Sequence, residues 1–402
     1  MIKTRLFALS FISAVVTLTL LTLIWNAIIC EKLRILRELL PLDSPSRPPS
    51  LFPYHHVIEQ MEWITEFATN KTDFPSTKSP VIYYDGQFLY HPTTSNGCRY
   101  KCIFTNTTHN LSRGDAAVFT NWFSVEESIT LKNRGVLIAF ETGESPLYAP
   151  ALLPAHLNQT ELFITYMAKS PVPYVYSVFV RNKIPRCRFT EEETAFMLSK
   201  NYMHLLPPYH RGRRKVIAWV ASNHYAKNSR IEFANSIASF IPVDIYGSNR
   251  MQFPPNVDAF HFLSINYKFY LSFENSNCRN YITEKVYVNA MQHDMIPIVL
   301  GAFKDDYEST LPPHSYINVD DYKSIRELTD YLYYLDKNDT AYAAYFAWKQ
   351  YGRLISSNRM DCRLCGFIHK LNAGTVDLPK QNSTEFLDFQ SLCFDRPLLP
   401  LK

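Results

Sequence analysis

Two glutamates lie in a short loop directly after a run of apolar residues. The run Gly135–Phe140 has the composition of a buried parallel strand, and the segment Phe-Glu-Thr-Gly-Glu-Ser-Pro that completes it contains Glu141 and Glu144. A carboxylate in a partly desolvated cleft can act as a general base. Glutamates in an arbitrary loop more often cap or pair with local groups, so that structural role is the alternative for both residues.

A second polar loop follows the apolar run Lys215–Val220 and contains Ser222 and Asn223. Arg230 opens the helix that is predicted after this loop. An arginine can hold a phosphate with parallel N–H groups of its planar guanidinium. A surface arginine is the simpler alternative, and the neighbouring strand end is what favours the phosphate role.

The most informative segment is the strand Phe269–Phe273 with the polar loop after it, which leads to a helix predicted over Ile282–Gln292. Thr283 is placed to cap that helix, and Lys285 lies in its first turn. A cation where the helix dipole already favours anions indicates an anionic ligand such as a diphosphate. The alternative is a solvated Lys285 with Glu284 complementing the dipole, and spacing alone weighs the two equally.

These segments belong to two successive series of alternating strands and helices. Such alternation is typical of parallel βαβ units, in which ligands bind outside the carboxyl ends of the strands. The sequence therefore predicts an α/β protein with two doubly wound, Rossmann-like domains that face a cleft, over residues 81–206 and 207–402. The predicted strands are Val81–Tyr84, Ala116–Phe119, Gly135–Phe140, Lys215–Val220, Val243–Gly247, Phe269–Phe273 and Ile296–Gly301, and the predicted helices are Glu191–Tyr202, Ser229–Phe240, Ile282–Gln292 and Ser324–Leu335.

The composition and the absence of common motifs exclude several classes of function. Of the 402 residues, 47% are hydrophobic and 11 are glycine, and Lys+Arg 41 against Asp+Glu 37 leaves a net charge of +4 without a basic block. This balance argues against nucleic-acid binding as the main activity. Neither GxxxxGK[ST] nor GxGxxG is present, so side chains and a helix N-terminus, rather than a glycine loop, must hold any phosphate. The absence of Asp-x-Asp, HExxH and GxSxG removes the common metal-diphosphate clamp and the usual metalloprotease and hydrolase signatures.

The N-terminal segment predicts an uncleaved membrane anchor. Residues 1–5 form a short basic tail, and residues 6–30 carry no charge and are long enough to cross about 30 Å of hydrocarbon. Residues 31–80 are predicted to form a stem, because the chain is Pro- and Ser-rich from Pro41 to Pro80 with only a short helical patch near Ile58–Phe67. Asn-x-Ser/Thr sequons after the anchor favour a body in the secretory lumen; they begin at Asn70, Asn106, Asn110, Asn158, Asn338 and Asn382.

The cysteines agree with an oxidising compartment. Cys30 lies at the membrane edge, and the cysteines after it are expected to form disulfides, with at least one left over because their number is odd. Cys362 and Cys365 form a CxxC pair, but no second CxxC or HxxxH completes a zinc site, so both are expected to be disulfide partners. The cysteines after the anchor are Cys98, Cys102, Cys187, Cys278, Cys362, Cys365 and Cys393.

The segment from Phe269 to Gly301 resembles the donor-binding signature of the Golgi α1,3-fucosyltransferases, glycosyltransferase family ten. The shared pattern is Phe-Tyr-Leu-x-Phe-Glu-Asn-Ser, then Tyr-Ile-Thr-Glu-Lys, then Pro-Ile-Val-Leu-Gly. The resemblance is strong in the second half of the chain and thin in the first. Further matching segments are Val220–Asn223 with Arg230, Val243–Gly247, residues 312–322, the CxxC pair, Asp115–Phe119 and Glu144-Ser145-Pro146.

This resemblance implies a GT-B fold and an inverting transfer of L-fucose from GDP-β-L-fucose to a GlcNAc acceptor. It implies Glu144 as the general base, because only Glu144 precedes the matching Ser-Pro, with Glu141 as the rival. It implies no metal ligands and no required cofactor, with Mn²⁺ or Mg²⁺ at most as a stimulant. Arg230 and Lys285 would neutralise the diphosphate, and Tyr281 and Glu284 would hold the fucose or ribose. The donor pocket that it implies consists of Ser222, Asn223, Arg230, Asn275, Tyr281, Glu284 and Lys285.

The resemblance also implies a cellular location and binding partners. A single-pass type II protein of the Golgi membrane is expected, anchored by residues 6–30, with GDP-fucose and a glycoprotein or glycan acceptor as partners. Asn277–Asn280 is similar to invertebrate members, which slightly favours the core GlcNAc of N-glycans over antennal LacNAc or LacdiNAc. Thr120-Asn121-Trp122 stands where many vertebrate members have His-His-Arg, so acceptor preference is not carried over. The alternative function is a catalytically weak or inactive homologue that acts as a membrane-anchored glycan-binding protein.

Overall fold

The computed structural model describes residues 50–69, 78–89, 91–223, 225–356 and 359–402. The predicted tail and membrane anchor, Cys30 and the sequon at Asn70 lie outside the described residues. No helix among the described residues is long and apolar enough to span a membrane. Internal contacts divide the chain into two units, residues 1–51 with 187–190 and residues 52–186 with 191–402, and both large sheets belong to the second unit.

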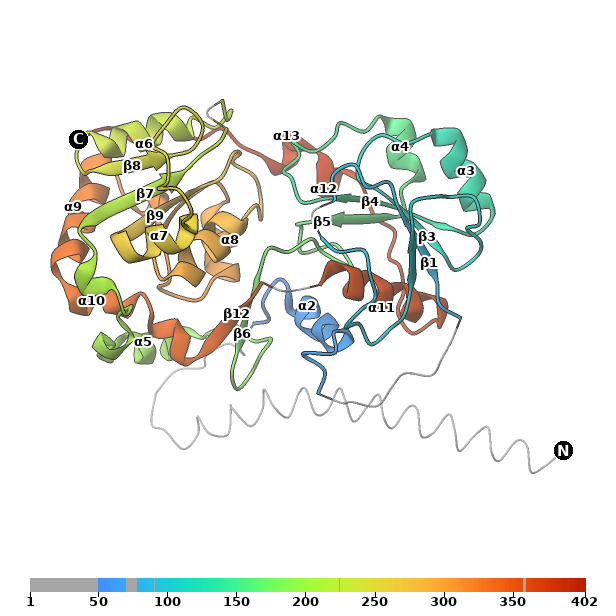
Figure 1. The fold of residues 1–402 in the computed structure, drawn as a ribbon, viewed down its shortest axis with the longest axis horizontal. Helices are drawn as coiled ribbons and strands as arrows, with labels where there is room; N and C mark the ends of the chain where they lie inside the picture. The colour runs from blue at the N-terminus through green and yellow to red at the C-terminus, as the bar shows by residue number, and fades with distance from the viewer. Residues whose placement is uncertain (1–49, 70–77, 90, 224, 357–358) are drawn as a thin grey trace. The chain divides into compact units, whose positions relative to one another are not determined.

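The first sheet has five strands, and every neighbouring pair is parallel (Figure 1). Its central strands are almost completely buried, as expected for a parallel sheet that is covered on both faces. In spatial order the strands are β2 (Ile103–Thr105), β1 (Val81–Tyr84), β3 (Ala116–Phe119), β4 (Leu137–Thr142) and β5 (Leu162–Thr165). The helices between these strands are α3 (Val125–Asn133) and α4 (Pro154–Gln159).

The second sheet also has five parallel strands. Its core includes an amphipathic helix, α9 (Ile325–Lys337), in which four fully buried residues recur at helical spacing: Ile325, Leu328, Leu332 and Leu335. In spatial order the strands are β11 (Ile317–Asn318), β10 (Ile296–Leu300), β9 (Tyr267–Phe273), β7 (Lys215–Val220) and β8 (Val243–Tyr246). The helices of this half are α6 (Arg230–Ala238), α7 (Ala259–Asn266), α8 (Lys304–Thr310), α9 (Ile325–Lys337) and α10 (Asp339–Ala344).

The two sheets confirm the predicted α/β fold with parallel strands, and each strand predicted from an apolar run is present. The helix predicted over Ile282–Gln292 is wrong in form, because Lys285–Ala290 (η4) is π-helical and Met291–His293 (η5) is 3₁₀. Thr283 does not cap this segment. Its hydroxyl lies 2.9 and 2.8 Å from the two carboxylate oxygens of Glu274, a buried group that needs donors to replace lost water.

A small antiparallel sheet lies outside the predicted pattern. Its strands, β6 (Val178–Arg181) and β12 (Gly352–Ile355), are far apart in sequence, so no local signal marks the pair. A Cβ atom at Gly352 would lie 2.4 Å from the carbonyl oxygen of Val180, so glycine permits the close approach. The remaining helical segments are α2 (His55–Gln60), η1 (Met61–Trp63), α5 (Glu191–Leu198), η2 (Met203–Leu205), η3 (His210–Gly212), η6 (Val319–Asp321), η7 (Ala347–Gln350), α11 (Met360–Asn372), α12 (Thr384–Leu387) and α13 (Phe389–Leu392).

Part of the segment predicted as a stem is folded into the larger unit. Within residues 31–80, Val57, Met61 and Ile64 are buried in one hydrophobic cluster with Cys98. The stem prediction therefore does not hold for α2 and η1. Their apolar patch is short, and the partners that bury it come from distant parts of the chain, which sequence composition does not reveal.

Helix α11 lies within the range predicted for the second domain, but it packs against the first sheet (Figure 1). Its Leu364 and Ile368 are buried in one cluster with Ile82 of β1 and Val118 of β3. The domain boundary at residues 206 and 207 stays a prediction. Disulfides attach this helix and the C-terminal segment to earlier parts of the chain: they are Cys98–Cys362, Cys102–Cys365 and Cys278–Cys393.

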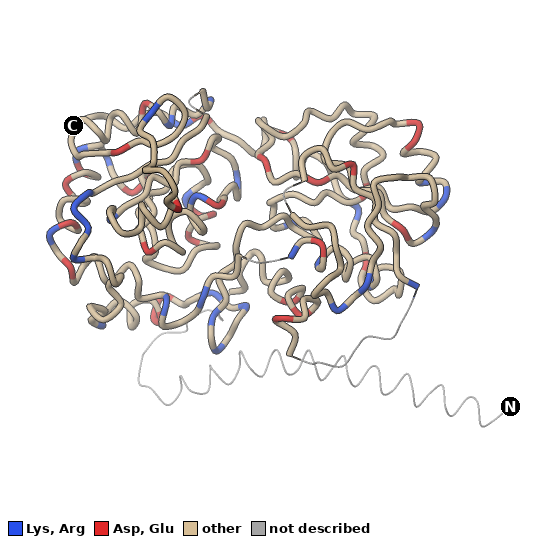
Figure 2. Tube along the Cα trace, in the orientation of Figure 1, with Lys and Arg blue, Asp and Glu red and all other residues tan. Residues whose placement is uncertain are grey.

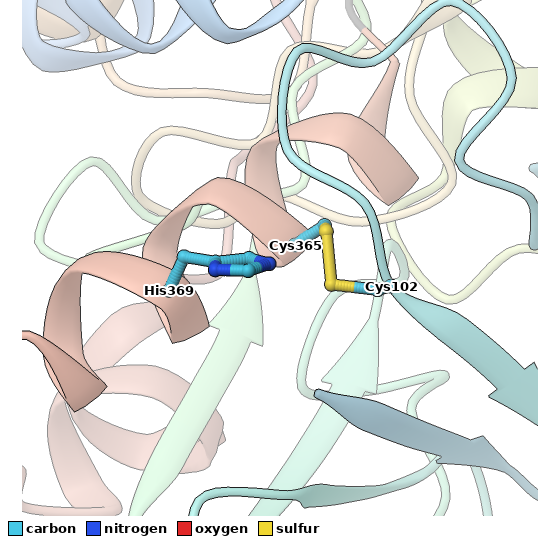
Figure 3. A group of neighbouring side chains, drawn as sticks. All are labelled: Cys102, Cys365 and His369. Carbon is cyan, nitrogen blue, oxygen red and sulfur yellow. A yellow bond between two sulfur atoms is a disulfide. The ribbon is translucent and has the colours of Figure 1, made fainter. Parts of the chain in front are cut away.

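The predicted role of the CxxC pair is confirmed, because Cys362 and Cys365 are both disulfide partners. His369 lies beside the Cys102–Cys365 bond (Figure 3). These three residues could hold a metal ion only as free ligands, and the two sulfur atoms are bonded to each other. The site is therefore a structural link between α11 and the segment before β2.

Candidate active site

Glu144 lies in the loop after β4, at the carboxyl end of the first sheet, and is exposed. Its Oε2 atom accepts hydrogen bonds from the hydroxyl of Tyr281, at 3.0 Å, and from the side-chain amide of Asn275, at 3.3 Å. Both donors come from the segment after β9 of the second sheet. Within the described part of the chain Oε1 has no hydrogen-bond partner, so this oxygen is open to a ligand.

The loops after β4 and β9 meet at a second point. Ser276 donates to Ser145 at 2.6 Å, and both residues are fully buried. Tyr281 is also buried, with its ring centroid 4.9 Å from that of Tyr166. Burial, with smaller contributions from acidic neighbours such as Glu144, raises the pKa of Tyr281 well above its ordinary value. Its hydroxyl therefore stays protonated and remains a donor to Glu144.

Glu141, the rival base, is in a different environment. Its side chain is 2% exposed. Oε1 lies 2.7 Å from Nε2 of His91, and Oε2 accepts from the hydroxyl of Tyr84 at 2.7 Å. A buried carboxylate with both oxygens engaged is poorly placed to take a proton from a bound molecule.

Lys285 lies at the start of η4 with its ammonium group between two carboxylates. Its Nζ is 3.1 Å from Glu274 and 2.9 Å from Glu284, and it also donates to the hydroxyl of Thr283 at 2.9 Å. Burial alone would lower the pKa of Lys285, but the charges of the two glutamates outweigh it and raise the pKa. The cation is therefore permanent. The side chain of Glu284 is 43% exposed, whereas that of Glu274 is 0% exposed.

Arg230 is the first residue of α6 and is 4% exposed. Its guanidinium donates to the carbonyl oxygens of Phe273, at 2.9 Å, and Asn223, at 2.8 Å. It therefore joins the carboxyl ends of the neighbouring strands β9 and β7. Burial lowers its pKa, and its Nε–H has no acceptor among the described residues. Ser222 is exposed in the loop after β7.

The structure thus brings the predicted residues together in three groups: Glu144 with Asn275 and Tyr281, Glu284 with Lys285, and Arg230 with Asn223. Glu274 acts on both of the last two groups, because its side chain pairs with Lys285 and its charge favours the cationic form of Arg230. Its carbonyl accepts from Asn228 at 2.9 Å. Neither Glu274 nor Asn228 was among the predicted site residues. A charged residue that ends an apolar strand was an available signal for Glu274, and nothing local marks Asn228.

Charges of both signs are interspersed along the described chain (Figure 2). The groups of side chains in this part of the chain that could share a metal ion are the two that contain disulfide-bonded cysteines. What the candidate site offers is an open carboxylate oxygen, two cations near strand ends and an exposed glutamate. These groups suit a ligand with a diphosphate and hydroxyl groups, and a reaction that removes a proton.

Residues 210–381 match the family model described as the C-terminal domain of glycosyltransferase family 10 (fucosyltransferase). This range contains β7, β9 and η4, and with them the cations Arg230 and Lys285. Glu144 lies outside the matched range.

Curated relatives agree with this match. Glycoprotein 3-alpha-L-fucosyltransferase A of Drosophila melanogaster is 44% identical over 164 residues, which are 40% of this chain and 32% of the relative. Alpha-(1,3)-fucosyltransferase 4 of Bos taurus is 33% identical over 210 residues, which are 52% of this chain and 48% of the relative. The match thus spans less than half the length of these relatives. A crystal structure of an alpha1,3-fucosyltransferase with GDP covers 82% of this chain and 99% of its own, with a TM-score of 0.49 and 19% identity.

Proposed function

Because residues 210–381 carry the C-terminal domain of glycosyltransferase family 10, we propose that the protein is an α1,3-fucosyltransferase that transfers L-fucose from GDP-β-L-fucose to a GlcNAc acceptor with inversion. In this proposal the two parallel sheets are the two Rossmann-like domains of a GT-B fold. The second sheet binds the donor, and the first supplies the base.

One observation supports Glu144 as the base: its Oε2 is held by two neutral donors while Oε1 is open. In the proposed step, Oε1 takes the proton of the acceptor hydroxyl as that oxygen attacks the anomeric carbon of fucose. The bond from fucose to phosphate breaks, and GDP leaves with the bonding electrons. A single displacement of this kind needs one base and a stabilised leaving group, and no protein nucleophile.

Lys285 and Arg230 are proposed to offset the charge of the departing diphosphate. Lys285 is shared by Glu274 and Glu284, of which Glu284 is the more accessible. Hydroxyl groups of fucose or ribose would replace Lys285 as the hydrogen-bond donors to Glu284. The ammonium group of Lys285 would then be free to bind a phosphate oxygen. Arg230 is buried, and its guanidinium donates to the carbonyl groups of Phe273 and Asn223. It would therefore fix the strand ends next to Asn223 and Asn275.

We assign the core GlcNAc of N-glycans as the favoured acceptor, ahead of antennal LacNAc or LacdiNAc. The similarity to a relative named glycoprotein 3-alpha-L-fucosyltransferase supports this choice. The proposed location is the Golgi lumen, with residues 6–30 as a type II anchor. Exposure of the sequon residues Asn106, Asn110, Asn158 and Asn382 supports a luminal body, because each can be reached by a glycan-adding enzyme.

The test uses the full-length chain in detergent with GDP-fucose and two acceptors, a core N-glycan glycopeptide and a LacNAc-terminated oligosaccharide, with and without EDTA. Mass spectrometry should show the gain of one deoxyhexose on the innermost GlcNAc, unchanged by EDTA. Gain on the LacNAc acceptor alone would contradict the acceptor assignment. Loss of transfer with EDTA would contradict a metal-independent reaction, and glycan binding with neither transfer nor GDP-fucose hydrolysis would favour the inactive glycan-binding alternative.

A further inference from the structure

A buried cluster of ionisable side chains lies next to the loop of Glu144 and has no role in the proposed mechanism. It consists of Tyr84 at the end of β1, His91 in the segment that follows, and Glu141 in β4. The side chain of His91 is 9% exposed and that of Glu141 2% exposed, with 2.7 Å between Nε2 and Oε1.

The hydrogen-bond partners determine where the protons are. Nδ1 of His91 lies 3.0 Å from the carbonyl oxygen of Pro92, which can only accept, so Nδ1 carries a hydrogen. Burial and the charge of Glu141 raise the pKa of Tyr84 well above its ordinary value, so the Tyr84 hydroxyl donates to Oε2. One hydrogen lies between Oε1 of Glu141 and Nε2 of His91, and the hydrogen bond and charge of Glu141 raise the pKa of His91, which places this hydrogen on Nε2. The ring is an imidazolium.

The other charged groups around this pair support the same state. Arg363 of α11 is fully buried and, as a cation, favours ionised Glu141, while Asp361 of the same helix favours a cationic His91. The ring of Tyr174 lies 6.2 Å from that of His91 and carries no charge. Burial alone would lower the pKa of His91, but the hydrogen bond and charge of Glu141 outweigh it and raise the pKa.

Glu141 and Thr142 end β4, and the turn of Gly143 and Glu144 that follows is held by hydrogen bonds and by ring packing. The hydroxyl of Thr142 accepts from the backbone N–H of Glu144 at 3.1 Å, and the carbonyl of Gly143 accepts from Tyr176 at 2.8 Å. A Cβ atom at Gly143 would lie 2.7 Å from the ring of Tyr174, the ring that also lies beside His91. The ring of Tyr174 therefore packs against both His91 and the turn that carries Glu144, and it links the two.

We propose that His91 is a positioning residue for fucosyl transfer: as an imidazolium it holds Glu141, and through the packed loop it keeps the carboxylate of Glu144 aimed at the acceptor. When Nε2 loses its proton, its lone pair faces a carboxylate oxygen of Glu141, and the two side chains repel each other. His91 and Glu141 then separate, and Glu144 is displaced from the acceptor hydroxyl. Turnover is therefore confined to pH values below the pKa of His91. The inference rests on the proposed role of Glu144.

The first test does not depend on catalysis. The full-length chain, labelled at the histidine ring carbons, is titrated by NMR, and His91→Gln assigns the resonance. His91 should titrate above about 6.5, the ordinary value for histidine. Glu141→Gln should lower that midpoint, because an amide donates to a neutral ring and no longer stabilises the cation. A ring of His91 that is neutral at pH 6.5 in the unmodified chain would overturn the inference.

The second test compares kcat across pH for the unmodified chain and three variants. Glu141→Gln should keep near-normal kcat at acidic pH and lose the alkaline decline, because the amide donates to a neutral His91 and still accepts from Tyr84. His91→Gln should lower kcat about tenfold with the KM for GDP-fucose unchanged, as expected for a displaced base. His56→Gln is the matched control. His56 is partly buried, its Nε2 lies 3.1 Å from the carbonyl oxygen of Ser170, and burial lowers its pKa to about 4.

The pH profiles of these variants distinguish a positioning role of His91 from a catalytic role of Glu141. An alkaline decline that persists in Glu141→Gln overturns the positioning role, and loss of kcat at every pH in that variant makes Glu141 the base. If His91→Gln does not fold, Glu141→Gln still decides the question, because it preserves the shape of the pair. Absence of transfer by the unmodified chain refutes the proposed function, while the NMR titration still decides whether His91 is an imidazolium.

Discussion

The carboxyl ends of the two sheets contribute to the site in different ways. At the second sheet, Asn275, Tyr281 and Lys285 come from one short stretch of sequence after β9. At the first sheet Glu144 and Ser145 reach this stretch from one loop, and both described donors to Glu144 belong to the other sheet. The proposed donor site is therefore encoded locally, whereas the environment of the proposed base exists only after the two sheets have come together.

The two ends also balance charge differently. Lys285 shares two carboxylates, whereas the partners of Glu144 are a neutral hydroxyl and a neutral amide. Neutral donors orient a carboxylate without cancelling its charge, so it stays able to accept a proton, while a cation in contact would make it a weaker base. This difference predicts that mutations at the two ends separate catalysis from binding.

The largest effect is expected for Glu144→Gln. The amide keeps the shape of the side chain but cannot accept the proton, so kcat should fall about 10²- to 10⁴-fold. The Kd for GDP, measured by calorimetry, should stay close to that of the unmodified chain. Near-normal turnover in this variant would show that the first sheet does not supply the base through Glu144.

Lys285→Ala should weaken GDP binding about 10- to 100-fold, because a charge-assisted hydrogen bond contributes about 1.5–3 kcal/mol. Calorimetry with GDP measures this change. Lys304→Ala is the control, since Lys304 is a lysine of α8 whose described partner is the exposed Asp321. Equal losses in both variants would indicate a general effect of charge and would contradict a specific role for Lys285.

Tyr281→Phe should lower kcat by about three- to tenfold, because one donor to Glu144 is lost while the ring still packs in its buried site. GDP affinity should change little, which distinguishes this variant from Lys285→Ala. Tyr333→Phe is the matched control, as Tyr333 is exposed and donates to the carbonyl of Phe240. A Tyr281 variant that loses GDP affinity and keeps kcat would place this tyrosine with the donor pocket alone.

The smallest effect on catalysis is expected for the double variant Cys278→Ser, Cys393→Ser. Loss of a native disulfide should lower the free energy of unfolding by about 2–4 kcal/mol, measured by urea denaturation. The loop keeps other anchors, since the backbone of Asn280 and the side chain of Arg279 both bond Asp306. The kcat of the folded variant should therefore stay near normal. A large loss of kcat would show that the disulfide itself holds the donor loop in place.

Much of the fold could be predicted because a buried parallel strand appears in sequence as a short apolar run. Strands β1, β3, β7 and β10 follow such runs closely. The pairing of β6 with β12 and the packing of α11 on the first sheet could not be predicted in this way. Their partners are far away in sequence, and the apolar pattern of a helix shows that a face is buried but not against what.

The sequence by itself determined the α/β class and the disulfide role of the CxxC pair, and it contains the motif on which the proposed donor site rests, because each depends on residue types within a short window. The tertiary structure decided which of two glutamates is open. Glu141 and Glu144 are separated by only two residues, yet one is enclosed by His91 and Tyr84 and the other is held by donors from the second sheet. Proton chemistry depends on burial and on nearby donors, and for these two carboxylates those are supplied by residues that are distant in the chain and close in space.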